Sequence, residues 1–164
     1  MMASAVAATG ISSAATGAFA QAAPTDETVN FTGTVGSVCV FSNNTPGTLM
    51  VDTVGDQIAA GFPGATMGSV DLDCTGGVDI SVGMPQDNGS STDLLLTAVD
   101  VRSFASVVGT PGAVASNDNG TSLSTGAIPG PFSDTVEVDM YIDAGAPIPA
   151  GAYDYNVVVT ATPQ

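Results

Sequence analysis

The residues best suited to chemistry are the two cysteines, Cys39 and Cys74, which lie 35 residues apart. With a period of two, each shares a strand face with apolar neighbours, so both are expected to point into a core. A zinc site needs four ligands, and two cysteines in a chain without histidine cannot supply them. We therefore interpret the pair as a disulfide, which requires an oxidising compartment. Two buried free thiols in a cytosolic protein are the alternative.

Pairs of acidic residues are the other candidates for chemistry. Asp71 and Asp73 share one strand face, so they could act as the paired carboxylates of a hydrolase. Glu137 and Asp139 form a second pair of this kind. The chain has no histidine or lysine and one arginine, so triads, Schiff bases and phosphate cradles lack their parts. Acids at alternate strand positions are typical of a solvated face. We predict no enzymatic activity and no catalytic residue, and a hydrolase that uses these acids is a rival hypothesis.

The composition is strongly acidic, with 16 Asp and Glu residues against one basic residue and a formal charge of −15. This charge excludes non-specific binding to nucleic acids and to anionic membranes. It is typical of a solvated, secreted surface, and calcium sites are the sharper alternative. Residues 87–89 and 118–120, both Asp-Asn-Gly, have turn chemistry and lack the ligand spacing of an EF-hand loop. We expect no metal and no cofactor.

Residues 1–20 predict an export signal, because they are rich in small residues, carry no charge and end in the small-x-small pattern AFA. The positively charged start of such a signal is missing, which predicts a translation start further upstream. Glycines and serines interrupt the apolar run too often for a membrane span. The expected organisation is a cleaved signal at 1–20, an N-terminal arm at 21–36 and one domain at 37–164. Export would lead through the periplasm to the cell surface or the medium.

The longest strand pattern covers residues 29–41, VNFTGTVGSVCVF. One face of it holds Val29, Phe31, Gly33, Val35, Ser37, Cys39 and Phe41. A strand of this length would span roughly 43 Å, whereas sandwich strands usually have about 5–6 residues. The Cys39 end is therefore expected to belong to this domain, and the Val29 end to a neighbouring copy.

Further strands are expected where apolar and polar residues alternate, or where short apolar runs are bounded by glycine and proline. These segments are residues 47–51, 68–74, 78–82, 94–101, 135–143 and 152–162. We expect the second and third to form a tight pair or one bulged strand. A turn is expected after Phe41, and residues 109–130 are expected to form a long surface loop with one short strand near Leu123. The pattern predicts an all-β antiparallel sandwich.

Two tyrosines of the last expected strand leave alternatives open. Tyr153 and Tyr155 share their register with Val157, Val159 and Ala161, which predicts that they point inward. Either they are core aromatics whose hydroxyls reach the rim, or they border a site for an incoming peptide.

Several short motifs follow one another in a fixed order along the chain. They are an export signal, an arm with alternating Val29, Phe31 and Val35, then Cys39, GTL at 47–49, VDLDCTG at 70–76 and PAGAYDYNVVVTATPQ at 149–164. Together they resemble the spore coat protein U domain, the pilin-like subunit of archaic chaperone–usher fimbriae. The resemblance spans nearly the whole mature chain.

This resemblance implies an immunoglobulin-like, pilin-type sandwich that lacks one strand, with a disulfide between Cys39 and Cys74. It implies that a periplasmic chaperone lends a strand first, and that the arm of the next subunit replaces it at an outer-membrane usher. The implied donor-strand residues are Val29, Phe31, Gly33 and Val35, with the glycine lying where no side chain fits.

The expected function is that of a secreted structural subunit that polymerises into an adhesive surface fibre by strand donation. The alternative is a self-complete, monomeric, secreted sandwich that binds a carbohydrate or another surface ligand. In that case residues 29–35 would pair within their own domain.

Overall fold

The structure of this protein is a computed structural model. It describes residues 30, 32–34 and 36–164. The chain divides into two units, residues 1–34 and 35–164. Within the described residues, all strands and a single short 3-10 helix belong to the second unit, called the domain below. None of the helical structure described is long and apolar enough to cross a membrane.

Most of the expected N-terminal features lie outside the described residues. These are the export signal at 1–20 and the donor-strand residues Val29, Phe31 and Val35. Gly33 is described, and it is exposed and outside any strand. Of the described residues in the stretch 29–41, the first in a strand is Cys39.

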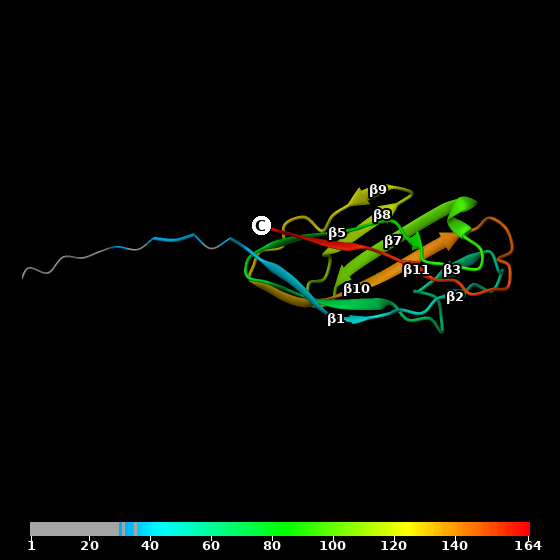
Figure 1. The fold of residues 1–164 in the computed structure, drawn as a ribbon, viewed down its shortest axis with the longest axis horizontal. Coiled ribbons are helices and arrows are strands. Elements are labelled where there is room, and N and C mark those ends of the chain that lie inside the picture. Colours follow the sequence, from blue (N-terminus) through cyan, green and yellow to red (C-terminus); the bar gives the residue numbers. More distant parts are fainter. Residues whose placement is uncertain (1–29, 31, 35) are drawn as a thin grey trace, which may run out of the picture. The chain divides into compact units, whose positions relative to one another are not determined.

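The domain is an antiparallel sandwich whose larger sheet has eight strands (Figure 1). Its main path runs through β1 (Cys39–Thr45), β4 (Gly68–Cys74), β10 (Phe132–Asp143), β7 (Asp100–Val107), β8 (Val114–Asp118) and β9 (Thr121–Leu123). Beside this path, β2 (Met50–Val51) pairs with β3 (Gln57–Ala59), which pairs with the end of β10. β10 alternates as its sequence predicts, because Val136 and Ile142 are fully buried while Glu137 is exposed.

A smaller layer covers the inner face of this sheet. In it, β5 (Val78–Val82) pairs with β12 (Val159–Pro163), and β6 (Gln86–Asp87) pairs with β11 (Tyr155–Asn156). Two buried polar side chains connect the layers. Ser103 Oγ donates to the Gly83 carbonyl at 2.6 Å, and Asn117 Nδ2 donates to the Val82 carbonyl at 3.4 Å. The prediction of an all-β antiparallel sandwich is confirmed.

The core consists of two apolar clusters that succeed one another along the sandwich. The first contains Leu72, Val78, Ile80, Ala105, Ala115 and Val136, among others. The second contains Ile58, Leu94, Val101, Met140, Ile142 and Ala144. Val157 packs against both clusters, so the C-terminal segment lies over the junction between them.

The expectation of one strand at 94–101 is wrong. Leu94–Leu96 forms the 3-10 helix η1, and β7 begins only at Asp100. The Asp93 side chain accepts a hydrogen bond from the Leu95 N–H at 2.9 Å, which turns the chain at the start of the leucine run. As a result Leu94 is buried and Leu96 is 83 % exposed, a split that helical geometry produces.

The expected tight pairing of residues 68–74 with 78–82 is also wrong. β4 and β5 lie in different layers, and the Val78 N–H donates instead to the Ile128 carbonyl at 2.9 Å. Two glycines allow the crossing between layers. A Cβ atom on Gly77 would lie 2.8 Å from the Ile128 carbonyl oxygen, so only glycine permits this close approach.

Two expectations about loops need correction as well. Residues 109–130 contain two strands, β8 and β9, rather than one. The expected turn after Phe41 is a bulge within β1, where the register with β4 shifts between Ser42 and Thr45. Asn43 adopts a φ of 51° in this bulge, a left-handed conformation that asparagine tolerates.

Candidate functional site: an open groove between two strand edges

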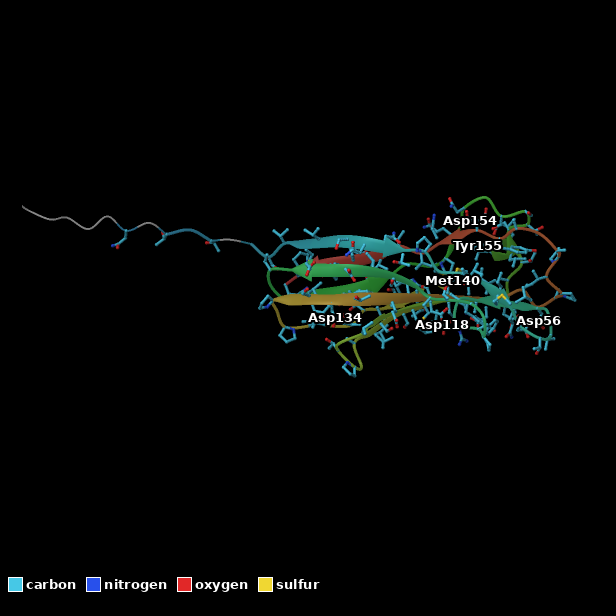
Figure 2. All side chains as sticks on the ribbon, turned by 90° about the horizontal axis from the view of Figure 1, so that it is seen from below. Asp56, Asp118, Asp134, Met140, Asp154 and Tyr155 are labelled. Carbon is cyan, nitrogen blue, oxygen red and sulfur yellow. A yellow bond between two sulfur atoms is a disulfide. The ribbon has the colours of Figure 1, made fainter. Side chains whose placement is uncertain are left out.

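A groove of about 1120 Å³ opens between β1 and the C-terminal segment of residues 148–159. Met140 of β10 lines it from the larger sheet, and Tyr155 of β11 lines it from the smaller layer. Figure 2 shows both labelled residues in the same half of the sandwich. Sites for small ligands usually hold about 300–1,000 Å³, so this groove is large for such a ligand. Its size suits an extended segment of chain.

Each side of the groove is bordered by the edge of a strand. In the part of the chain that the structure describes, β1 pairs only with β4, and β12 pairs only with β5. The second edge of each strand therefore carries backbone N–H and C=O groups without a strand partner. Such edges can form main-chain hydrogen bonds with an added strand.

The floor of the groove is apolar. Val70 of β4 and Val138 of β10 are half-buried there and pack against the first core cluster. Three large apolar side chains at the rim remain substantially exposed, namely Phe41 (40 %), Met50 (43 %) and Val51 (41 %). These side chains give the groove an apolar rim as well as an apolar floor.

Burial alternates along the C-terminal wall, which also brings the exposed Asp154 and Asn156 to the groove. Tyr153, Tyr155, Val157 and Val159 line the groove and are half-buried, while the residues between Tyr153 and Val159 are exposed. The inward register expected for the two tyrosines is therefore confirmed. They pack against the second core cluster and also border the groove, and whether a peptide occupies that groove is a matter for the proposal below.

Hydrogen bonds hold the tyrosine hydroxyls in place. The Tyr155 hydroxyl accepts from the Leu94 N–H at 3.2 Å, and the Tyr153 hydroxyl donates to the Pro149 carbonyl. Burial raises the pKa of Tyr155 above its ordinary value, so its ring stays neutral at ordinary pH. The two tyrosines of this wall are thus held in position by hydrogen bonds.

The segment between β1 and β2 forms the opposite wall, and Gly47 sets its position. A Cβ atom on Gly47 would lie 2.6 Å from the Gly68 nitrogen and 2.7 Å from the Thr66 carbonyl oxygen. Next to it, the Thr48 N–H donates to the Thr66 carbonyl at 2.8 Å. Only a glycine allows this approach, which gives the GTL motif at 47–49 a structural role.

The cysteines lie at one end of the groove wall. Cys39 and Cys74 are opposite each other on β1 and β4 and form a disulfide. The predicted disulfide is therefore confirmed. Immediately before it, the Val38 N–H donates to Thr75 Oγ1 at 3.0 Å, and the Thr75 N–H donates to the Val38 carbonyl at 2.9 Å.

The paired acids lie along β4 and β10. Asp71 accepts hydrogen bonds from Asn43 Nδ2 at 2.8 Å and from Thr135 Oγ1 at 2.7 Å, and these lower its pKa. Asp139 lines the groove, and burial raises its pKa. Of the four acids, Asp139 thus lies at the groove. Asp71 instead accepts hydrogen bonds that hold β1 and β10 to β4.

The two Asp-Asn-Gly segments form turns, as their sequence predicts. Asp87 accepts from the N–H groups of Gly89 and Ser90 at 3.2 and 3.1 Å. Asn119 and Gly120 have φ values of 47° and 87° in the β8–β9 hairpin, a geometry typical of Asn-Gly. Within the described ranges, no three His, Cys, Asp or Glu side chains are grouped so as to hold a metal ion.

Comparisons of this chain with protein family models, with curated proteins and with solved structures found no match. The groove and its two strand edges are therefore the observations on which a function can be built.

Sequence reasoning missed several groove residues. Phe41 shares a strand face with Cys39, which predicts a core position. In the structure its side chain lies at the rim of the groove and is partly exposed. Met50 lies in the expected strand at 47–51, but strand alternation did not mark it as a groove residue. Ile148 lies in a segment without a clear period. Gly47 had a weak marker, its place in the GTL motif.

Proposed function

We propose that this protein is a structural subunit that polymerises into a surface fibre by strand donation. Residues from about Thr28 to Gly36 of one copy occupy the groove of another. The observation that supports this proposal is an open apolar groove bordered on both sides by unpaired strand edges. The sandwich is then an immunoglobulin-like fold that a neighbouring copy completes.

The chemistry of the groove favours a peptide segment as its occupant. A strand laid between β1 and β12 gains main-chain hydrogen bonds at both edges, and its alternate side chains enter the apolar floor. Val29, Phe31 and Val35 are apolar residues of one register, and Gly33 stands between them. This alternation matches a floor made of Val70, Val138, Met140 and their neighbours.

Chain reach favours a neighbour's segment over the same copy's own. Val38 is hydrogen-bonded to Thr75 at the end of β1, so its position is fixed. A segment ending at Val35 would have only residues 36 and 37 in which to reverse direction and enter its own groove. Between copies, the chain can continue without a reversal. This supports a polymer, whereas the self-complete monomer requires the reversal.

The partners of such a subunit follow from its exposed groove. Before assembly, the apolar floor and the free edges need a temporary strand, which a periplasmic chaperone would lend. An outer-membrane usher would then exchange that strand for the arm of the next copy. The assembled fibre would lie at the cell surface, where adhesion is its expected role.

Assembly can be tested with the mature chain, starting at residue 21. The expected product is a ladder of species that resists mild denaturant in gel electrophoresis without heating. Phe31→Arg should abolish the ladder, because the guanidinium would lose its hydration against the apolar side chains Val70, Val138 and Met140 of the floor. Thr32→Arg is the matched control, since it places the same charge on the opposite face of the donor strand, and it should leave the ladder intact.

Deletion of residues 21–35 should also abolish the ladder, and a peptide of residues 28–36 added before assembly should block it. A chain that runs as a stable monomer with a protease-resistant arm would overturn the proposal. Equal ladders from Phe31→Arg and Thr32→Arg would overturn the assigned register.

A further inference from the structure

The two ends of the sandwich differ, and each carries exposed apolar side chains. We call the end at which β10 starts the base and the end at which β10 stops the tip. Figure 2 shows Asp134, early in β10, and Asp56, beside the end of β10, at opposite ends of the domain. The inference drawn here rests on the proposed function, because it concerns how consecutive copies meet.

Three apolar side chains on the loops at the tip, Val54, Leu96 and Val99, are 75 %, 83 % and 66 % exposed. We call these three residues the tip patch. Backbone hydrogen bonds hold the loops of Val54 and Val99 to the segment around the end of β10, where the Ala144 N–H also donates to the Asp56 carbonyl at 2.9 Å. The Val99 N–H donates to the Asp143 carbonyl at 2.8 Å, and the Ile148 N–H donates to the Gly55 carbonyl at 2.7 Å. The patch is therefore held on ordered loops.

The base carries a second patch, made of Val38, Val40 and Pro131. Val38 and Val40 are 55 % and 57 % exposed, and Pro131 is exposed as well. We call these three residues the base patch. They border a hollow of about 380 Å³ beside the disulfide. An apolar side chain from another molecule could enter this hollow.

The strand directions restrict how a donated strand can lie. β1 starts at the base, where Cys39 pairs with Cys74, and runs toward the tip. The C-terminal segment runs the other way and ends at the base, where the Gln164 N–H donates to the Gly77 carbonyl (Figure 1). A donated strand between them is parallel to one and antiparallel to the other. Its C-terminal end, which continues into the donor domain, therefore leaves the groove at the tip if the strand is parallel to β1, and at the base if it is antiparallel to β1.

The tether between donor strand and domain is short. From Val35 to Val38 the chain spans at most about 10–11 Å. Because Val38 lies at the base of the donor copy, that base must sit close to where the strand leaves the acceptor groove. Exit at the acceptor's base would bring two bases together and favour a reciprocal pair that stops growing. Exit at the tip places base on tip and allows unlimited growth.

We propose that the tip patch of one copy docks on the base patch of the next copy in the fibre. Each copy has a formal charge of −15, so copies offer each other no charge attraction, and an apolar contact is what can hold them. The contact is heterologous, since different surfaces meet, and it repeats along the fibre. It adds an interface to strand donation and sets the angle between consecutive domains.

The rate at which ladders dissociate in denaturant tests this contact. Leu96→Ser at the tip and Val38→Ser at the base each remove apolar area without adding charge. Each should speed dissociation by about tenfold, the effect expected for losing part of one buried aliphatic side chain. Leu123→Ser is the matched control, because Leu123 is 65 % exposed on β9 and belongs to neither patch. Its ladders should dissociate like those of the unaltered chain.

Cross-linking provides a second measurement. Chains with Leu96→Cys and chains with Ser133→Cys, a base residue beside the hollow, are assembled together and oxidised. Cross-linked dimers that survive heating and disappear on reduction are expected. Leu123→Cys mixed with Ser133→Cys should give none.

The outcomes separate the two proposals. Ladders that form normally, with end variants no faster than Leu123→Ser and without cross-links, overturn the tip-to-base contact and leave strand donation standing. Assembly that stops at two copies also overturns the contact, because it indicates base-to-base exchange. A chain that runs as a stable monomer with a protease-resistant arm overturns both.

Discussion

Val38 and Thr75 are joined by two hydrogen bonds, one from the Val38 N–H to Thr75 Oγ1 at 3.0 Å and one from the Thr75 N–H to the Val38 carbonyl at 2.9 Å. They continue the ladder of β1 and β4 by one step beyond the disulfide. These two hydrogen bonds therefore fix the backbone at Val38, immediately after the N-terminal arm.

The first prediction concerns the hydrogen bond from the Val38 N–H to the Thr75 hydroxyl. Thr75→Val keeps the shape of the side chain but removes the acceptor of the Val38 N–H, so it should lower the free energy of unfolding by about 0.5–1 kcal/mol. Urea unfolding followed by circular dichroism measures the change. Thr75→Ser keeps the hydroxyl and should lose less. Equal losses from both variants would show that the hydroxyl bond contributes nothing.

The second prediction concerns the disulfide. Replacing both cysteines, Cys39→Ser with Cys74→Ser, should lower the free energy of unfolding by about 3–4 kcal/mol, because the bond closes a loop of 35 residues in the unfolded chain. Denaturant unfolding of the variant and of the reduced natural chain should agree. A loss below about 1 kcal/mol would mean that the unfolded chain is already compact around this loop.

The third prediction concerns the groove wall at Gly47. Gly47→Ala forces a Cβ atom against the backbone of Gly68 and Thr66, so it should destabilise the domain by about 1–3 kcal/mol. Gly83→Ala is the matched control, since its Cβ would meet the Val158 carbonyl oxygen at an ordinary 3.6 Å. Thermal unfolding should separate the two variants. Similar melting temperatures would contradict the close approach.

The fourth prediction is a pH dependence at Asp139. Burial raises the pKa of this carboxyl above 3.8 in the folded state, so its charged form disfavours folding. Its contribution is most favourable below the unfolded pKa and is lost as the pH rises through the folded pKa. Asp139→Asn should therefore raise the free energy of unfolding at pH about 7 and give no gain at pH about 3.

The control for this prediction lies on the same strand. Glu137→Gln removes one negative charge from an exposed position of β10, so it accounts for the general relief of charge repulsion. The gain from Asp139→Asn should exceed the gain from Glu137→Gln in urea unfolding at neutral pH. A loss of stability from Asp139→Asn would contradict the role of burial.

Period-two alternation predicted the parts of the fold that have one core face and one wet face. The buried side chains of β10 and of the C-terminal segment lie on the expected faces, from Val136 to Ile142 and from Tyr153 to Ala161. The segment expected as one strand at 152–162 forms two, β11 and β12, which belong to different sheets. The disulfide followed from two cysteines that were each in phase with apolar neighbours. In these elements the side chains alone determine which face is buried.

The predictions of a strand at 94–101 and of a tight pair at 68–82 were wrong because of local interactions that alternation does not encode. At Leu94–Leu96 an aspartate cap turned an apolar run into a 3-10 helix. At Gly76 and Gly77 the chain crosses between layers, because glycine permits a contact that no side chain would allow. The family resemblance implied a missing strand, but alternation did not identify the residues that line the groove, such as Phe41 and Met50. Alternation predicts which face of a strand is buried and not which edge of a strand lacks a partner.

The one basic residue has a consequence for packing between fibres. Arg102 Nη2 lies 2.6 Å from Asp100 Oδ2, and Arg102 Nε lies 3.6 Å from Asp118 Oδ1, so its charge is compensated within its own domain. No other lysine or arginine exists in the chain. In the proposed fibre, filaments lying side by side would therefore repel at separations up to roughly 8 Å in physiological salt. Such an assembly would lengthen single threads and would not thicken them into bundles.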